Sequence, residues 1–323
     1  DMSDKVNTPD YTMLWFDEVT STMDKARELS SKIPSKFFAV GATSQLKGRG
    51  TRGRDWISSN NNLLLTIAIH RSLVPIPITL LPLRVGSIIG SCMARRVTAP
   101  QSQLTLKWPN DILINSRKAC GVLIEMEGDM LLVGIGCNVL AAPTVNAATN
   151  GPNAAPVIRP ATCLAEHNAE LAALAASLLA QQRQQSEQSE GDSGNTHNSM
   201  NSTVIPPLSI SREHTDTTES ISGSSKMDGV PVQLTLRHGD AHKELGIEIC
   251  DSLHHWATAR TDTAAQVLGD FSRNMDYSPQ RLRDVADPLL STVIPTGLNP
   301  DGTLKVKYAH NGEEGMLMAE YLW

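Results

Sequence analysis

A basic, glycine-rich stretch at residues 45–56 carries the residue types best suited to chemistry. It places four cations, Lys47, Arg49, Arg52 and Arg54, among three glycines. Glycine permits backbone conformations that other residues disfavour, so such a loop can wrap an anion and offer it both backbone N–H groups and guanidinium donors. The stretch therefore predicts a flexible clamp for phosphate or carboxylate groups, which closes when the ligand arrives.

The glycines of this loop, Gly48, Gly50 and Gly53, also fit the G-x-G-x-x-G pattern of dinucleotide-binding proteins. That pattern should open a helix directly after a strand, whereas here it runs into the turn-forming residues 55–62. We therefore disfavour a nicotinamide or flavin site. Taken alone, the loop is equally typical of a solvated arginine–glycine surface loop or of a nucleic-acid contact.

Composition favours a small anionic ligand over a polyanion. The chain has 323 residues, a net charge of -6, 40% hydrophobic and 4% aromatic residues, which suits one large globular domain and a small one. The basic loop is thus a local feature of an acidic molecule, and we expect no nucleic-acid partner. No apolar run reaches the roughly 18 residues that span a bilayer, so we also expect no membrane association.

The cysteines indicate a reducing compartment. There are five, an odd number, and none has C-x-x-C spacing, which is unlike a disulfide framework. The polar residues 1–12 do not resemble a signal peptide. We therefore expect a cytoplasmic location, while a targeting segment removed from the start would leave a mitochondrial one open.

Four further motifs surround the loop in a fixed order. S-T at 21–22 precedes it, K-W-P-N-D follows at 107–111, R-K-A-C-G-V-L-I-E at 117–125, and G-I-G-C-N at 134–138. Together, over residues 14–140, they resemble the catalytic domain of biotin protein ligases, the family of holocarboxylase synthetase and biotin–[acetyl-CoA-carboxylase] ligase. Several motifs in one order are far more specific than any single one.

The resemblance implies an activity. The family uses ATP to convert biotin to biotinyl-5'-AMP and pyrophosphate, and then transfers biotin to a lysine of a carboxylase's biotin-carrier domain. ATP and Mg²⁺ would be the cofactors and biotin the substrate. Such activation is needed because carboxylate is a poor electrophile, and cations must hold the two anions together.

The resemblance also implies a role for each matched residue. Lys118, which would press the biotin carboxylate against the α-phosphate, and Arg49, which would clamp the activated biotin, are the expected catalytic residues. The residues expected to bind biotin are Ser21, Thr22, Gln45, Gly48, Arg49, Lys118 and Gly121. The residues expected to bind ATP are Arg52, Arg54, Trp56, Lys107, Asn110 and Asn138. Asp111 is the expected ligand of Mg²⁺, which prefers oxygen donors.

Several of these residues also have a plain structural explanation. Ser21 or Thr22 suits the N-cap of a helix, Asp111 suits a turn cap, and Trp56 suits a core anchor. A lone lysine in a turn is usually solvated. Lys118, however, enters a buried strand, and that position can point its ammonium inward.

The elements that must position these residues follow from periodicity. We expect strands at 13–16, 37–40, 62–69, 104–114, 119–127, 130–139 and 230–236, and helices at 21–29, 79–97, 160–185 and 264–282. Pro109 should create a bulge or edge within its strand, and residues 128–129 a hairpin turn. The predicted fold class is α+β, with a mixed, largely antiparallel sheet packed with helices, similar to class II synthetase catalytic domains.

Four segments are expected along the chain. Residues 1–12 form a polar lead-in, 13–285 the catalytic domain, and 286–323 a small C-terminal β domain resembling the SH3-like barrel of biotin ligases. Within the second, residues 186–226 have few large apolar side chains and are expected to be a disordered insertion. No winged-helix pattern precedes residue 14, so we expect the family's DNA-binding domain to be missing.

Two alternatives stay open. A lipoate or octanoate protein ligase or transferase would share the fold and the mixed anhydride, but its R-R-x-x-G-G-G run is missing from this sequence. A non-enzymatic nucleic-acid-binding protein would use the basic loop for salt-dependent binding of oligonucleotides. We expect a monomer or weak homodimer, and the carrier domains served are not specified by the sequence.

Overall fold

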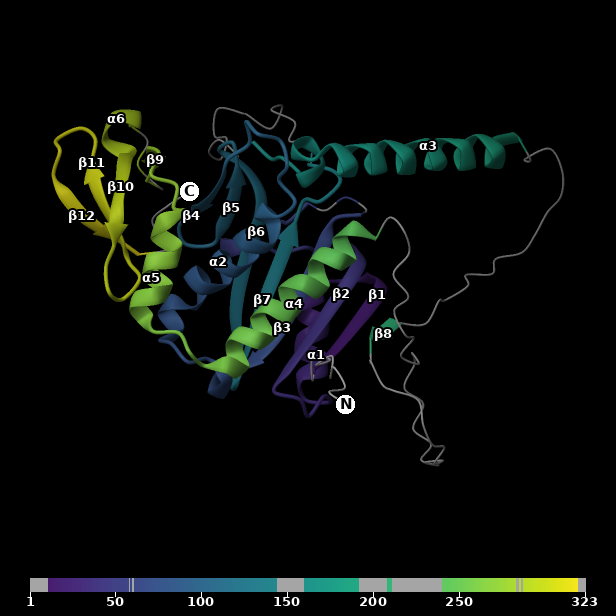
Figure 1. The fold of residues 1–323 in the computed structure, drawn as a ribbon, viewed down its shortest axis with the longest axis horizontal. Helices are drawn as coiled ribbons and strands as arrows, with labels where there is room; N and C mark the ends of the chain where they lie inside the picture. Colours follow the sequence, from purple (N-terminus) through teal and green to yellow (C-terminus); the bar gives the residue numbers. More distant parts are fainter. Residues whose placement is uncertain are drawn as a thin grey trace, which may run out of the picture.

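The computed structural model describes residues 11–57, 59, 61–143, 160–191, 208–210, 240–282, 285 and 287–318. Most of the expected lead-in, the strand expected at 230–236, much of the insertion expected at 186–226 and the last residues of the chain lie outside this part. Within it, two sheets and the helices around them can be followed (Figure 1).

The larger sheet forms the centre of the protein and has eight strands in the order β4-β5-β6-β7-β3-β2-β1-β8. Their bounds are β1 (Thr12–Val19), β2 (Phe37–Gln45), β3 (Leu63–His70), β4 (Leu104–Lys107), β5 (Asp111–Ile114), β6 (Arg117–Glu127), β7 (Met130–Cys137) and β8 (Leu208–Ile210). β1 and β2 are parallel, and the other neighbours are antiparallel. The mixed, largely antiparallel sheet expected from the sequence is confirmed.

Helices cover both faces of this sheet, which explains why its central strands are apolar on both sides. On one face α1 (Thr22–Ser30) packs Met23 and Ala26 against Phe38 and Val40 of β2. On the other face lie α2 (Leu81–Ala94) and α4 (Ala241–Ala259), and α5 (Ala264–Arg273) packs beside α2 (Figure 1). The two faces therefore have separate hydrophobic cores.

The strand expected at 104–114 is wrong, because the chain reverses in its middle. β4 and β5 are antiparallel neighbours, with Lys107 opposite Asp111. Pro109 lies in the turn between them instead of forming a bulge, since a proline cannot donate to the ladder of a continuous strand. The Trp108 side chain is buried, and its Nε1 donates to the carbonyl of Gly302 at 2.8 Å. The reversal brings Asp111 beside β6.

The later helices also differ from the expected ranges. α3 (Ala169–Gly191) begins after residue 160 because residues 160–165 bond to β6 and to the chain after β7 instead, and it projects away from the sheet (Figure 1). α5 ends at Arg273, short of residue 282. α4 lies where no element was expected.

Part of the insertion expected to be disordered is ordered. Residues 186–191 continue α3, and β8 at 208–210 pairs antiparallel with β1. Without β8, β1 would be an edge strand with unpaired backbone groups. β8 supplies partners to β1 at Met13, Leu14 and Trp15. The remainder of that insertion lies outside the described residues.

The second sheet is small and antiparallel, in the order β12-β11-β10-β9. Its strands are β9 (Gln280–Arg281), β10 (Thr292–Leu298), β11 (Leu304–Tyr308) and β12 (Glu314–Leu317), and α6 (Pro288–Ser291) precedes β10. Alternate side chains of these strands, such as Val293 and Val306, are buried. This arrangement is consistent with the SH3-like C-terminal domain expected from the sequence.

Candidate active site

Glycines of β6 and β7 form a flat floor on the sheet face that α1 covers. Gly121 lies directly opposite Gly136 in the β6–β7 pair. A Cβ atom on Gly136 would lie 2.3 Å from Cε2 of Trp56, and one on Gly121 would lie 3.1 Å from Cζ3 of Trp56 and 3.0 Å from Nζ of Lys118. The missing side chains therefore make room for an indole ring and an ammonium group.

Lys118 points toward this floor. Its Nζ lies 2.8 Å from Oδ1 of Asp111 on β5 and 5.5 Å from the centre of the Trp56 ring. The side chains of Lys118 and Asp111 are 26% and 18% exposed, so both are partly buried yet reachable from solvent. The structure thus brings Trp56 into one cluster with Asp111, Lys118 and Gly121 of the β5–β6 segment.

A chain of polar groups lies between α1 and the sheet. Oε1 of Gln45 accepts from the N–H of Thr22 at 2.9 Å and from its hydroxyl at 3.3 Å. The hydroxyl of Thr66 donates to that of Thr22 at 2.9 Å. Ser21 occupies the N-cap position of α1, but its side chain makes no capping bond, and Gln45 takes over that role for a first-turn N–H.

The basic loop folds back on itself. The N–H of Trp56 donates to the carbonyl of Gly48 at 2.9 Å, and that of Gly50 to the carbonyl of Arg54 at 2.7 Å. A Cβ atom on Gly48 would lie 2.5 Å from the Trp56 carbonyl and 2.6 Å from Nε2 of Gln45. Gly48 therefore lets the loop, Trp56 and the Gln45 amide approach closely.

Arg49 is held by two carboxylates at the edge of the site. Its Nη2 lies 2.9 Å from Oδ1 of Asp24 on α1 and 3.5 Å from Oε2 of Glu125 on β6. Arg27 contacts the same two carboxylates, at 2.8 and 2.6 Å. The clamp role expected for Arg49 stays a prediction, and here its guanidinium ties the loop to α1 and β6.

Other residues expected to bind ATP lie in three places: the basic loop, the strand β4 and the turn between β4 and β5. Arg54 bonds within its own loop, to the hydroxyl of Thr51 at 2.8 Å, and Arg52 lies in the short 3-10 helix Thr51–Gly53. Lys107 is buried in β4. Asn110 donates through Nδ2 to the carbonyl of Val122 at 2.6 Å, so its amide fastens the β4–β5 turn to β6.

Asn138, just after β7, is buried and incompletely bonded. Its Nδ2 donates to the carbonyl of Thr162 at 3.0 Å. Its Oδ1 is buried and has no hydrogen-bond partner in the part of the chain that the structure describes. Since buried acceptors are nearly always satisfied, this atom suits a donor on a ligand, as the role expected for Asn138 requires.

Sequence reasoning missed three contributors to the site. Asp24 and Glu125 hold Arg49, and Thr66 completes the polar chain. The signal for Thr66 was a lone hydroxyl in an apolar strand. A Cβ atom on Gly134 would lie 2.8 Å from the sulfur of Met23, so Met23 packs against the glycine floor.

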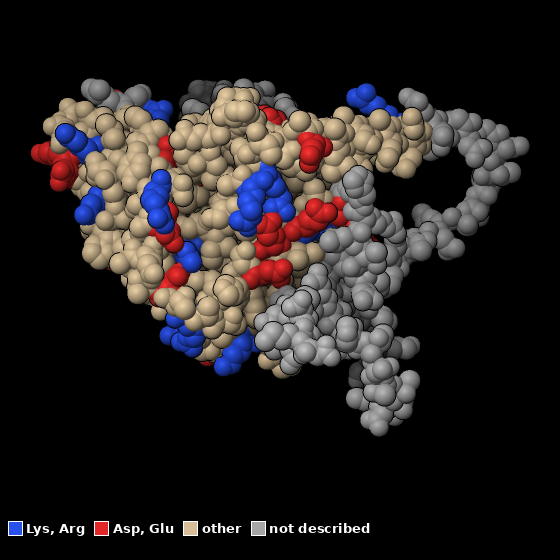
Figure 2. Space-filling model, viewed as in Figure 1, with Lys and Arg blue, Asp and Glu red and all other residues tan. Residues whose placement is uncertain are grey.

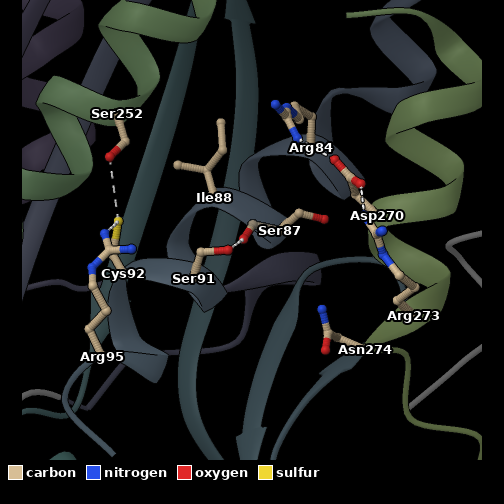
Figure 3. Close-up of a pocket in the computed structure, with 10 residues that line it drawn as sticks. All are labelled: Arg84, Ser87, Ile88, Ser91, Cys92, Arg95, Ser252, Asp270, Arg273 and Asn274. Carbon is tan, nitrogen blue, oxygen red and sulfur yellow. Dashed lines mark hydrogen bonds and ion pairs between the residues drawn. The ribbon is translucent and has the colours of Figure 1, made fainter.

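A separate hollow of about 310 Å³ lies between α2, α4 and α5, on the opposite face of the sheet (Figure 3). Its arginines are already paired: Arg84 lies 2.9 Å from Asp270, and Arg95 contacts Glu248. None of the residues expected to bind ligands lines it. The Lys118 cluster, and not this hollow, is therefore the candidate active site.

Charge on the molecular face drawn in Figure 2 is mixed. Basic side chains there lie next to acidic ones, with no broad patch of a single sign. Proteins that bind nucleic acids gather cations on one surface. This face therefore does not have the charge distribution of a nucleic-acid interface.

Comparison with known proteins agrees with the geometry. Residues 15–140 match the model of the biotin/lipoate A/B protein ligase family. The bifunctional ligase/repressor BirA of Bacillus subtilis is 32% identical over 139 residues, covering 41% of this chain and 41% of the relative. Biotin–[acetyl-CoA-carboxylase] ligase of Paracoccus denitrificans is 29% identical over 136 residues, covering 41% and 56%. The chain thus matches about half or less of the length of these curated relatives.

Solved structures are similar over nearly the whole chain. Biotin protein ligase from Leishmania major in complex with biotin covers 97% of this chain and 100% of its own, with 26% identity and a TM-score of 0.51. The Aquifex aeolicus enzyme with biotin and ATP covers 95% and 99%, with 19% identity and a TM-score of 0.55. The arrangement of the two sheets thus has the fold of biotin protein ligases. Within that fold, residues 15–140 are the segment that matches the biotin/lipoate A/B protein ligase family model.

Proposed function

We propose that the protein is an ATP-dependent biotin–protein ligase, which makes biotinyl-5'-AMP and transfers biotin to a lysine of a carboxylase's biotin-carrier domain. The observation that carries this proposal is the Lys118 ammonium, held 2.8 Å from Asp111 above a glycine floor. It lies within the segment that matches the biotin/lipoate ligase family.

In the first step, a carboxylate oxygen of biotin attacks the α-phosphorus of ATP. An O–P bond forms, the bond to the β-phosphate oxygen breaks, and pyrophosphate leaves. The positive charge of Lys118 offsets the repulsion between the two anions and stabilises charge on the transferring phosphate. The partial burial of its ammonium strengthens this effect, because charges interact more strongly away from bulk water.

In the second step, the amine of the acceptor lysine attacks the carbonyl carbon of the mixed anhydride. An amide forms, AMP leaves, and the amine loses a proton. We assign no residue as the base that takes this proton.

The binding residues divide between the two substrates. The Thr22–Gln45–Thr66 chain provides hydroxyl and amide groups suited to a ureido ring, which has two donors and an acceptor. Oδ1 of Asn138, which has no hydrogen-bond partner among the described residues, suits a donor such as an adenine amine. Trp56 offers a flat π-face for the base.

Asp111 has hard oxygen donors, which suit Mg²⁺, but its Oδ1 already lies 2.8 Å from Nζ of Lys118, so the carboxylate would be shared between the ammonium and the ion. The structure's described part has no group of three His, Cys, Asp or Glu side chains placed to hold a metal. Mg²⁺ would therefore complete its shell with water and phosphate oxygens, as it commonly does. Bound there, it would neutralise phosphate charge.

The second candidate is a lipoate or octanoate ligase, since the matched family includes both kinds of enzyme. The polar chain at Thr22 favours biotin, because a ureido ring can exchange hydrogen bonds with hydroxyl and amide groups, whereas a dithiolane ring or an alkyl chain cannot. The similar solved complexes that contain biotin also favour it.

The test uses the purified protein, ATP, Mg²⁺ and a biotin-carrier domain, with the mass of the carrier as readout. Biotin should add one biotinyl group per carrier, whereas lipoate and octanoate should add none. Lys118→Ala, shown to be folded by circular dichroism, is the matched control and should leave the carrier unmodified. Lipoyl or octanoyl addition, or no modification with any acid, would refute the proposal.

Partner and location assignments stay predictions. We propose a monomer or weak homodimer that works in the cytoplasm on carrier domains of carboxylases. All five cysteines are buried and unpaired. No helix in the described ranges is long and apolar enough to cross a bilayer.

A further inference from the structure

We propose that His167 is a positioning residue of the active site, which acts through Thr162 on a short strap, residues 160–165, to fix Lys118 and Asn138. The role of those two residues rests on the proposed function, whereas the hydrogen-bond network described below does not. No sequence motif pointed to the strap.

The strap bonds to the backbone of Lys118 on one side. The N–H of Lys118 donates to the carbonyl of Pro160 at 2.8 Å, and the N–H of Thr162 donates to the carbonyl of Lys118 at 2.9 Å. This pairing compensates for an irregularity in the neighbouring ladder, where the β5–β6 register shifts between Ile112 and Leu113. The strap therefore bonds to both backbone polar groups of Lys118 and so restrains the point from which its side chain starts.

On the other side the strap bonds to the chain leaving β7. The N–H of Leu164 donates to the carbonyl of Asn138 at 3.0 Å, and the N–H of Ala165 to that of Val139 at 3.0 Å. The carbonyl of Thr162 also accepts from Nδ2 of Asn138 at 3.0 Å. This last bond orients the amide so that its other atom, Oδ1, is the one without a partner in the ranges that the structure describes.

His167 holds the centre of the strap in place. Its Nε2 lies 2.9 Å from the hydroxyl of Thr162, and its Nδ1 lies 2.7 Å from the hydroxyl of Ser102. Its carbonyl accepts from the N–H groups of Thr98 and Ala99 at 3.0 and 3.1 Å. His167 thus connects the strap to the segment between α2 and β4.

An imidazole suits this position because it can bond to two hydroxyls at once. Burial, aided by the charge of Arg117, lowers the pKa of His167, so the ring is neutral near pH 7 and carries one donor and one acceptor. Thr162 is 0% exposed and His167 is 4% exposed. Removing one partner would leave a buried polar atom unsatisfied, which costs more than an exposed bond would.

The consequence for catalysis is geometric. Misplacing a reacting group by about 1 Å can cost about 100-fold in rate. The strap contacts both Lys118 and Asn138. Loosening it should therefore lower kcat, because Lys118 is displaced, and raise KM for ATP, because Asn138 is displaced. A residue that only stabilised the fold would lower the melting temperature without this split.

The experiment compares Thr162→Val with Thr162→Ser. Valine keeps the shape but removes the hydroxyl, whereas serine keeps the hydroxyl. In biotin-dependent ATP–pyrophosphate exchange, Thr162→Val should lose about 10- to 100-fold in kcat and raise KM for ATP, and Thr162→Ser should stay within about threefold of wild type. Ser87→Ala is the matched control, since its hydroxyl bonds only to Leu83 within α2 on the far face, and it should change neither constant.

Hydrogen exchange gives a readout that does not depend on activity. The amides of Lys118 and Thr162 should exchange faster in Thr162→Val than in wild type or Thr162→Ser. If Thr162→Val fails to fold, Ser102→Ala, at a half-buried position, tests the same network with an expected two- to tenfold loss in kcat. Unchanged exchange protection together with unchanged kinetic constants in a folded variant would overturn the proposal. If the wild-type protein showed no biotin-dependent ATP–pyrophosphate exchange, the proposed function would be refuted instead. The amide hydrogen-exchange data would still show whether Thr162 and His167 hold residues 160–165 in place.

Discussion

Adding a single methyl group at Gly136 should separate ATP binding from folding. In Gly136→Ala the new Cβ would lie 2.3, 2.6 and 2.7 Å from three atoms of the Trp56 ring, distances that real structures do not show. Gly136 is fixed by pairing with Leu64 of β3 on one side and Gly121 of β6 on the other. The ring, which sits on a loop, must therefore move.

The size of the effect follows from what the ring loses. A base stacked on an aromatic side chain contributes about 1–3 kcal/mol. At about 1.4 kcal/mol per factor of ten, displacing Trp56 should raise KM for ATP by about 5- to 150-fold. The fold should be little affected, because alanine is favoured over glycine within a strand by about 0.5–1 kcal/mol and the clash is relieved by loop movement.

The assay is biotin-dependent ATP–pyrophosphate exchange at varied ATP, with thermal unfolding and tryptophan emission measured on the same samples. Emission should shift to the red as the Trp56 ring enters water. Gly269→Ala in α5 is the control, because a Cβ atom there meets nothing within 4 Å. A folded Gly136→Ala protein with unchanged KM would refute the ATP role of Trp56. Global unfolding would instead identify Trp56 as a core anchor.

Two further predictions concern charge. Asp24→Asn removes the closer partner of Arg49. Since both side chains are well exposed, the free energy of unfolding should change by less than about 1 kcal/mol. Trypsin should nevertheless cut the ligand-free basic loop of Asp24→Asn faster than that of the control variant Glu28→Gln, whose change lies on the same helix. Equal cleavage would show that Asp24 does not restrain the loop. Burial lowers the pKa of His242 to about 4. Between about pH 6.5 and 4 this histidine is therefore protonated in the unfolded chain but not in the folded protein. The free energy of unfolding should fall by about 3 kcal/mol as the pH is lowered through this range. His242→Phe should remove this loss in urea unfolding at pH 7 and 4.5, because neither ring nitrogen has a hydrogen-bond partner within the described part of the chain; an unchanged pH dependence would exclude His242 as its source.

The core of the fold was accessible from sequence because its signals are local. The runs at 62–69 and 119–139 are rich in apolar residues, and a tight turn divides the second; buried strands have that pattern. The reversal between β4 and β5 was not accessible in this way. Pro109 marks an interruption without showing whether the chain bulges or reverses, and the bond that holds the turn, from Trp108 to the carbonyl of Gly302, joins residues far apart in the sequence. α4 escaped notice because it follows a long polar stretch that gives no boundary signal.

The candidate site divides along the same line. Motifs identified Lys118, Gly121 and Asn138 as residues of interest, because unusual residue types recur there in a fixed order. Motifs could not indicate that Asp24 would hold the loop arginine or that residues 160–165 would bond to Lys118. Those contacts join segments brought together only by the sheet and the helices on it.

The most direct test of the central claim is biotin-dependent exchange of labelled pyrophosphate into ATP by wild-type protein and by Lys118→Ala, with biotin binding measured by calorimetry. Wild type should exchange with biotin and not with lipoate. Lys118→Ala should lose at least about 100-fold in exchange rate, as expected when a group that stabilises developing charge is removed, and should still bind biotin. Near-normal exchange by folded Lys118→Ala would contradict the account.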